Sequence, residues 1–383
     1  MRVGGTTRCC SAVALIGTCV LALDAAPPPP PPSLFPIQQL WTLALNSQMP
    51  APPAFDGAIG YFPIDHDRVV AYELGPGTRK WIIDAHPEAD PAAGGGLLFM
   101  VESGALTARQ SADGAIVWQV PLPAELTVPP VWDNGWLIAA TKNREVAALR
   151  SADGTTVWRQ TIGGDAHARP AIAADRIYVP TDDGHVVALQ MDDGKVIWDR
   201  RISGAANDIL ALDERLYVGS NDNNLYCILT KDGSVDWKWP TGGDVIGLPA
   251  SDEHNVYFVS LDNILRALDL KSGAQRWKTT LPLRPTRGPL RVLDALIVTG
   301  IAPKVAAYTT KDGKPAGDVP STGDLAAAPQ LVGGAGTTKP LLILVTSDIA
   351  KGAGVAALTR ASEPPVVPIV PLPNITPVMV PKS

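Results

Sequence analysis

The sequence predicts an all-β fold made of repeated four-stranded antiparallel sheets, and three observations support this. Tryptophans recur every 37 to 40 residues, a glycine stands four residues before six of them, and a small residue stands ten residues before the same six. A self-similarity of about 40 residues marks stacked or radial units that cannot bury a core alone. Since no segment has helical periodicity, four-stranded units of this length predict a β-propeller.

The repeat has seven tryptophan markers and seven glycine markers that are offset by one unit. Gly313 is followed four residues later by Gly317 instead of tryptophan, whereas Trp41 stands upstream of the first glycine marker. The structural repeat residues are Trp41, Trp81, Trp118, Trp158, Trp198, Trp237, Trp277, Gly77, Gly114, Gly154, Gly194, Gly233, Gly273 and Gly313.

Each unit divides into four short strands. Residues 170–173 (PAIA), 176–180 (RIYVP), 185–190 (HVVALQ) and 195–198 (KVIW) are rich in β-branched or aliphatic residues, and Asp and Gly occupy the breaks between them. Glycine tolerates positive φ and aspartate bonds the local backbone, so these breaks predict tight turns. Four short strands joined by such turns form one antiparallel meander.

Two further columns run in register with the tryptophans. The residue ten positions before each marker is small, as at Ala148, Ala188 and Cys227. We expect it to leave room for the large ring of the outer strand to pack between neighbouring sheets. A proline twelve residues after a marker, such as Pro170, is expected to open an innermost strand, where a ladder N–H is dispensable.

The markers also predict the number of blades. Seven units close at the marker positions that run from Trp81 to Gly317, and an eighth unit begins near Asp318 but lacks its outer strand. Residues 37–45, with Trp41 in the marker position, supply a strand that can complete it. Pairing the two ends of the chain removes both open sheet edges, which would otherwise invite aggregation. We therefore expect eight blades, with the last built from both ends, over residues 37–363.

The N-terminus predicts export from the cytoplasm. Residues 1–26 contain Arg2 and Arg8 followed by an apolar stretch of the length of a signal peptide. Three interpretations remain open: lipidation at Cys19 after cleavage, cleavage near Ala25 without lipidation, and a retained short anchor.

Proline-rich segments flank the predicted body. Residues 27–36 include a run of six prolines, which forms an extended and fairly stiff spacer. Residues 364–383 form a second proline-rich segment, whose prolines exclude a central strand. We expect this tail to pack along the body, with binding of a partner as the alternative.

Composition and motifs exclude several function classes. A net charge of −6 and a pI near 5.4 argue against nucleic acid, since binding phosphates requires a basic surface. The five histidines are scattered and no spacing predicts a metal site. Cys227 is the one cysteine downstream of the signal region and is expected to be a small buried residue. With no nucleophile elbow, P-loop or Cys-x-x-Cys motif, we predict no catalytic, cofactor-binding or metal-binding residue.

The pattern Ala-(x)5-Gly-(x)3-Trp at residues 148–158, 188–198 and 267–277 resembles the repeat of pyrroloquinoline-quinone-type (PQQ-like) propellers. The same repeat occurs in quinoprotein dehydrogenases and in non-catalytic proteins, so the resemblance is specific for the fold and not for activity. Among the non-catalytic members, the chain is similar in length, export signal and blade number to the BamB family of outer-membrane assembly lipoproteins. This resemblance implies a location in the periplasm or at the outer membrane of a bacterium.

The residues do not match what the dehydrogenase resemblance implies. Those enzymes carry two adjacent cysteines against the quinone and a calcium site made of carboxylate and amide side chains. Here the adjacent pair, Cys9 and Cys10, lies in the export signal, and no glutamate at the spacing of a calcium loop follows Asp222. We therefore predict an exported non-catalytic scaffold that needs no cofactor, with a quinone- or small-ligand-dependent oxidoreductase as the alternative.

In this architecture one face carries both the loops between second and third strands and the loops that lead to the next blade. These loops vary from blade to blade, and loops on a rigid scaffold are where binding usually resides. Arg169, Asp208 and Arg287 flank the starts of inner strands and are expected at the mouth of the ring. Asp182, Asp222 and Asp244 are further candidates, each with a solvated turn as the alternative. We expect a monomeric propeller that binds a protein or peptide of the cell envelope.

Overall fold

A computed structural model describes residues 32–65, 67–301, 305–321, 323–333, 340–348 and 351–361 of the chain. The predicted export signal at 1–26, its cysteines, and the proline-rich tail at 364–383 lie outside these ranges. All elements within them are β-strands. The described part of the chain contains no helix that is long and apolar enough to cross a membrane.

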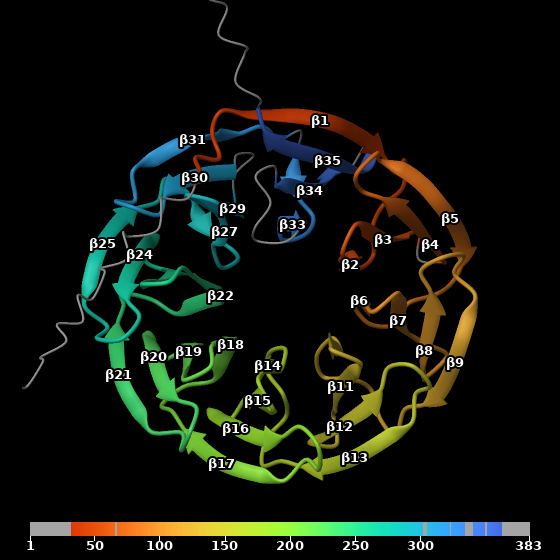
Figure 1. Ribbon diagram of the computed structural model, residues 1–383, viewed down its shortest axis with the longest axis horizontal. Coiled ribbons are helices and arrows are strands. Elements are labelled where there is room, and N and C mark those ends of the chain that lie inside the picture. The colour runs from red at the N-terminus through yellow and green to blue at the C-terminus, as the bar shows by residue number, and fades with distance from the viewer. Residues whose placement is uncertain are drawn as a thin grey trace, which may run out of the picture. The chain divides into compact units, whose positions relative to one another are not determined.

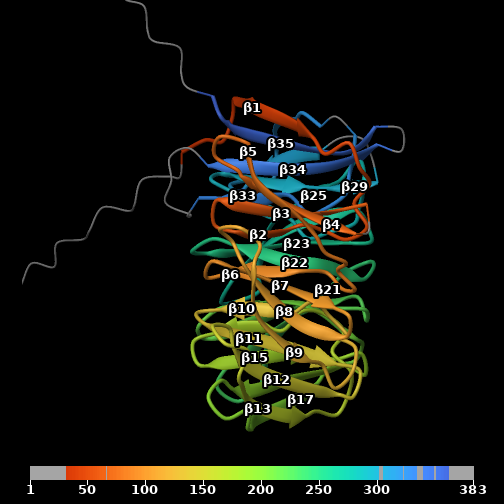
Figure 2. The ribbon, with the colours of Figure 1, turned by 90° about the vertical axis from the view of Figure 1, so that its right-hand side faces the viewer.

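Eight antiparallel sheets are arranged as blades around a central axis, which confirms the predicted eight-bladed propeller (Figure 1). In each of the first six blades the strands follow one another from the axis to the rim in chain order. Figure 2 shows the ring from its edge, where the strands cross its thickness and their connections lie on two opposite faces.

The first four blades each contain four consecutive strands. In chain order these strands are β2 (Ala54–Asp56), β3 (Ile59–Ile64), β4 (Arg68–Glu73), β5 (Thr78–Asp84); β6 (Ala92–Gly94), β7 (Leu97–Glu102), β8 (Ala105–Gln110), β9 (Ile116–Pro121); β10 (Val131–Asp133), β11 (Trp136–Thr141), β12 (Glu145–Arg150), β13 (Thr156–Thr161); β14 (Ala171–Ala173), β15 (Arg176–Pro180), β16 (His185–Gln190) and β17 (Val196–Arg201).

Blades 5 and 6 keep this pattern, blade 7 gains a small two-stranded sheet, and blade 8 joins the two ends of the described chain. Their strands are β18 (Ala206–Ala211), β19 (Arg215–Ser220), β20 (Asn224–Leu229), β21 (Val235–Pro240); β22 (Val245–Ser251), β23 (Asn255–Ser260), β24 (Ile264–Asp269), β25 (Gln275–Thr280); β26 (Arg284–Pro285), β27 (Leu290–Val292), β28 (Ala295–Val298), β29 (Gly300–Ile301), β30 (Val305–Thr309), β31 (Pro315–Val319); β32 (Asp324–Leu325), β33 (Gln330–Val332), β34 (Leu341–Asp348), β35 (Gly352–Arg360) and β1 (Ile37–Ala44).

The tryptophans act as wedges between blades, and the glycines make room for them. Trp118 of blade 2 packs on Gly154 of blade 3, where an added Cβ would lie 2.7 Å from the indole ring. Gly154 also has a φ of 72°, as its turn requires. Within the blade, Trp118 pairs across the ladder with Ala108, the small residue ten positions earlier. The glycine column therefore serves both the turn and the packing of the preceding blade.

A hydrogen bond fixes most of these wedges. The Trp118 indole Nε1 donates to the Ser151 carbonyl oxygen at 2.8 Å, and Trp198 donates to Thr230 in the next blade at the same distance. The bond recurs at Trp41, Trp81, Trp158 and Trp277. Trp237 is the exception in the described chain, because its buried Nε1 has no hydrogen-bond partner.

Blade 8 closes the ring in the way that the sequence predicted. Strand β1 pairs antiparallel with β35, and Trp41 lies opposite Ala357, next to a register shift. The sheet then continues from β35 to β34, which pairs with the short inner strands β32 and β33. The outer strand of the last blade therefore comes from the opposite end of the described chain (Figure 1).

Blade 7 lacks a tryptophan, and a residue from the N-terminal side lies in its place. A Cβ on Gly317 would meet the ring of Phe35 at 2.5 Å. The neighbouring Leu34 is fully buried in the cluster between blades 7 and 8, and its amide donates to Asp294 Oδ1 at 2.8 Å. The packed body therefore begins upstream of β1, inside the stretch predicted as a spacer.

Candidate binding face

The two families of loops meet on one face of the ring, as expected from the topology. The Asp182 amide donates to the Asp165 carbonyl oxygen at 3.0 Å, and the Asp165 amide donates to Asp182 Oδ1 at 3.2 Å. In blade 6 the Leu261 amide likewise donates to the carbonyl oxygen of Asp244 at 2.9 Å. We call this side the loop face.

At the axial end of this face, Arg169 lies close enough to influence two carboxylates from other blades. Burial raises the pKa of Asp208 in β18, and the charges of Arg169 and His167 partly offset that effect. Burial also raises the pKa of Asp90, just before β6, with Arg169 opposing it again. Because these residues come from blades 2, 4 and 5, only the axis can bring them together.

Asp90 was missed by the sequence reasoning, although a signal for it exists. Asp90 and Pro91 directly precede β6, as Arg169 and Pro170 directly precede β14. Pro91 stands two residues earlier than the proline column, so the alignment of that column skipped it.

The other three aspartates hold loops in place and do not converge on one site. Asp182 bonds the neighbouring loop, as described above. Asp222 accepts a hydrogen bond from the Tyr226 hydroxyl, and the carbonyl of Asp244 accepts one from the backbone. Since they belong to blades 4, 5 and 6 and serve local turns, the structure does not gather them with Arg169.

Arg287 lies shortly before β27, the inner strand of blade 7. Burial lowers the pKa of its guanidinium, whose Nη2 lies 3.5 Å from the Ala326 carbonyl oxygen. A Cβ on Gly247 would lie 2.0 Å from the Gly288 nitrogen, so the two backbones touch. Strand β22 shifts register at this point, and Leu248 is left 52% exposed.

A second exposed apolar side chain lies along the same segment. Ile301 is 73% exposed and pairs with Arg284 between strands β29 and β26. Residues 284–288 thus contact Ile301 at one end and the Leu248 backbone at the other. We call Leu248, Arg284, Arg287 and Ile301 the blade 6–7 patch. Sequence reasoning named only Arg287, since exposure of Leu248 depends on a bulge that periodicity does not reveal.

The described residues contain no group of three histidine, cysteine, aspartate or glutamate side chains that could hold a metal ion. Cys227 is buried against Trp237, and burial raises the pKa of its thiol to about 12. Such a thiol is a packing residue, because a reactive cysteine requires an accessible thiolate.

These features define a PQQ-like β-propeller of eight blades with a variable loop face. The family model described as outer membrane protein assembly factor BamB matches residues 38–127, 104–211 and 209–336, which together exceed half of the chain. The chain belongs to this family.

Solved structures agree on the fold. BamB from Moraxella catarrhalis superposes with a TM-score of 0.67 at 18% identity, covering 85% of this chain and 98% of that one. Quinohemoprotein alcohol dehydrogenase from Comamonas testosteroni has a TM-score of 0.66 at 13% identity, covering 86% and 77%. The computationally designed Ika8 protein has a TM-score of 0.70 at 10% identity, covering 84% and 99%. Identities this low establish the fold alone. Among curated protein sequences, none matches the chain.

Proposed function

We propose that this protein is an exported, non-catalytic scaffold that binds a protein of the cell envelope and takes part in outer-membrane protein assembly. It would act as a monomer in the periplasm or at the outer membrane. Membership of the BamB family supports the class of partner, and a rigid eight-bladed ring supports a scaffold role.

The blade 6–7 patch is the observation that carries the proposal. Exposed apolar side chains beside arginine are typical of the centre of protein interfaces, where arginine is enriched and lysine is depleted. Leu248 and Ile301 are the two most exposed large apolar residues of the loop face, and Arg287 is already partly desolvated. A partner with an apolar segment flanked by carboxylates would match this surface.

Recovery of partners from an envelope extract tests the proposal. We expect the unaltered chain to capture a component of the assembly machinery, and Leu248→Glu to reduce that capture about tenfold or more, equivalent to about 1.4 kcal/mol. The control is Ile116→Glu, since Ile116 is 54% exposed on the outer strand β9, away from the loop face.

Capture of no assembly component would contradict the proposed role. Equal capture by Leu248→Glu and Ile116→Glu would show that the partner binds elsewhere. An absorption spectrum after incubation with the quinone and calcium tests the oxidoreductase alternative, because a stoichiometric bound chromophore would replace the scaffold proposal.

A further inference from the structure

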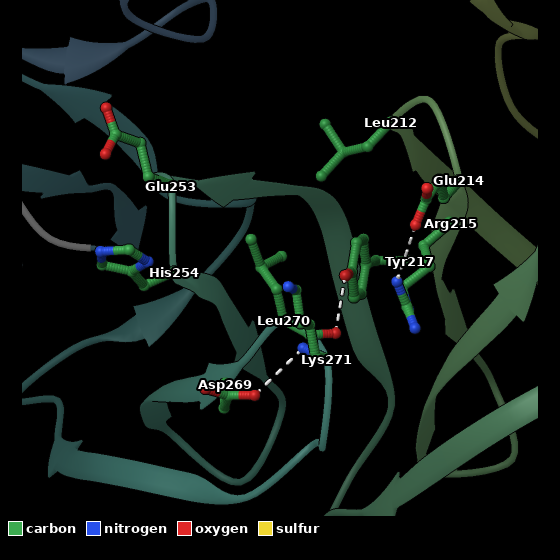
Figure 3. Close-up of a pocket in the computed structure, with 9 residues that line it drawn as sticks. All are labelled: Leu212, Glu214, Arg215, Tyr217, Glu253, His254, Asp269, Leu270 and Lys271. Atoms are coloured by element: carbon green, nitrogen blue, oxygen red, sulfur yellow. Dashed lines mark hydrogen bonds and ion pairs between the residues drawn. The ribbon is translucent and has the colours of Figure 1, made fainter. Parts of the chain in front are cut away.

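The face opposite the loops contains a cavity of about 260 Å³ in the wedge between blades 5 and 6 (Figure 3). Two hairpin tips and one turn form it: the β18–β19 hairpin, the β22–β23 hairpin and the β24–β25 turn. We call it the blade 5–6 pocket. Its lining includes Leu212, Glu214, Tyr217, Glu253, His254 and Leu270.

One difference in sequence between blades 4 and 5 accompanies the open wedge. In blade 4, Arg176 begins β15 and its Nη1 donates across the wedge to the Thr230 carbonyl oxygen of blade 5. Arg215 begins β19 in the same way, yet its Nε and Nη2 both donate to Asp236 Oδ2 at 3.2 Å within its own blade. Ile197 stands in blade 4 where blade 5 has Asp236. The Asp236 carboxylate therefore keeps the Arg215 guanidinium on its own blade.

Hydrogen bonding inside the wedge is also altered. The Leu270 carbonyl oxygen, the expected acceptor for Trp237, receives a 2.8 Å hydrogen bond from the Tyr217 hydroxyl. The Trp237 indole N–H has no acceptor, whereas the Thr310 carbonyl oxygen in the next wedge accepts from both Tyr257 and Trp277. A buried donor left unpaired is destabilising, so hydrogen bonding in this wedge is less complete than in its neighbours.

The lining combines an apolar floor with an acidic rim. Leu212, Leu270 and the ring of Tyr217 offer apolar surface, while Glu214 and Glu253 lie on two different hairpin tips (Figure 3). Glu253 has no ion pair among the described residues, and Glu214 has only a 3.5 Å contact with Arg215.

With direct partners included, carboxylates outnumber cations at the pocket. The carboxylates are Glu214, Glu253, Asp269 and Asp236, and the cations are Arg215, Arg276 and Lys271. Asp236 already neutralises Arg215, and Arg276 pairs with Asp269. Lys271 is the one cation left against the two carboxylates Glu214 and Glu253, so the net charge at the rim is negative and favours a cation.

We propose that the blade 5–6 pocket binds a lysine or arginine side chain of a polypeptide. The apolar stem would lie against Leu212 and Tyr217, and the charged head would lie between Glu214 and Glu253. A pocket for a whole small ligand usually has 300–1,000 Å³, so the smaller volume suits a single side chain. Because the pocket is on the opposite face from the blade 6–7 patch, this proposal is independent of the partner proposed above.

Calorimetric titration of the full chain with short peptides tests the proposal. We expect acetyl-Gly-Ala-Arg-Ala-Gly-amide to bind at least ten times more tightly than the same peptide with neutral citrulline in place of arginine. Glu253→Gln should weaken binding threefold or more. Asp236→Asn should weaken it at least tenfold, since released Arg215 can then reach into the wedge as Arg176 does.

Asp175→Asn is the matched control, because Asp175 occupies the position of Glu214 one blade earlier, where Arg176 already bridges the wedge. Equal binding of the arginine and citrulline peptides would overturn the proposal, as would equal effects of Asp236→Asn and Asp175→Asn. Binding of cadaverine as tight as that of the peptide would assign the pocket to a free amine instead. Should Asp236→Asn fail to fold, Glu253→Gln still decides, with thermal melting as the check on folding.

Discussion

At the scale of single residues, each marker glycine meets two requirements at once. It adopts a left-handed backbone conformation, and it leaves space for the tryptophan ring of the preceding blade. Gly154 needs a left-handed backbone, and its missing side chain leaves the surface on which Trp118 lies. Gly135 also has a positive φ, of 87°, but no atom lies within 4 Å of an added Cβ. Comparing the two positions isolates the packing requirement from the backbone requirement.

We expect Gly154→Ala to lower the free energy of unfolding by about 2–5 kcal/mol. Left-handed backbone costs about 1–2 kcal/mol for a residue with a Cβ, and crowding against Trp118 adds about 1–3 kcal/mol. Gly135→Ala should carry only the first cost. Urea unfolding followed by tryptophan fluorescence measures both. Equal losses at the two sites would mean that the tryptophan moves aside freely.

The residue columns also show which features were predictable from sequence. Trp118, Ala108 and Gly154 recur in register, so the blade number and the pairing of β1 with β35 could be predicted. The contact of Trp118 with the glycine of the next blade was missed, because the turn alone explained that glycine. Leu248 and Asp90 were missed because a bulge and a two-residue offset break the columns.

At the scale of elements, the segment ahead of β1 completes blade 7 as well as blade 8. Leu34 is fully buried and Phe35 lies against Gly317, at the one marker in blades 1 to 7 that lacks tryptophan. Nothing local in the sequence links Phe35 to Gly317, which are 282 residues apart. The composition of this segment predicted a spacer because prolines dominate it. Its contacts with blades 7 and 8 occur once each, so no repeat in the sequence reveals them.

Phe35→Ala tests this contribution. We expect a loss of about 2 kcal/mol in the free energy of unfolding, below the 3–5 kcal/mol of a fully buried phenylalanine because Phe35 is half-buried. Leu40→Ala, at a 50% exposed position in β1, should change stability by less than about 0.5 kcal/mol. Chemical denaturation of both variants provides the comparison, and a neutral Phe35→Ala would contradict the wedge role.

At the scale of the whole molecule, ring closure depends on one strand. Removal of residues 32–45 would expose the edge of β35, and an unpaired edge invites pairing with another chain. We expect the shortened chain to elute as oligomers in size-exclusion chromatography, and a synthetic peptide of residues 33–45 to restore the monomer. A shortened chain that stays monomeric without the peptide would show that blade 8 tolerates its loss.

The pairing of β1 with β35 determines when the ring can close during synthesis of the chain. Synthesis delivers a chain from its N-terminus, so Trp41 appears early while its partner Ala357 appears more than three hundred residues later. Contacts between such distant residues form slowly, because a long loop must close first. Until β35 has been synthesised, β1 has no partner strand, although the chain that forms the first seven blades is already present. Nascent molecules of this protein therefore have a waiting period that finished molecules do not, and any factor that shields β1 would act only then.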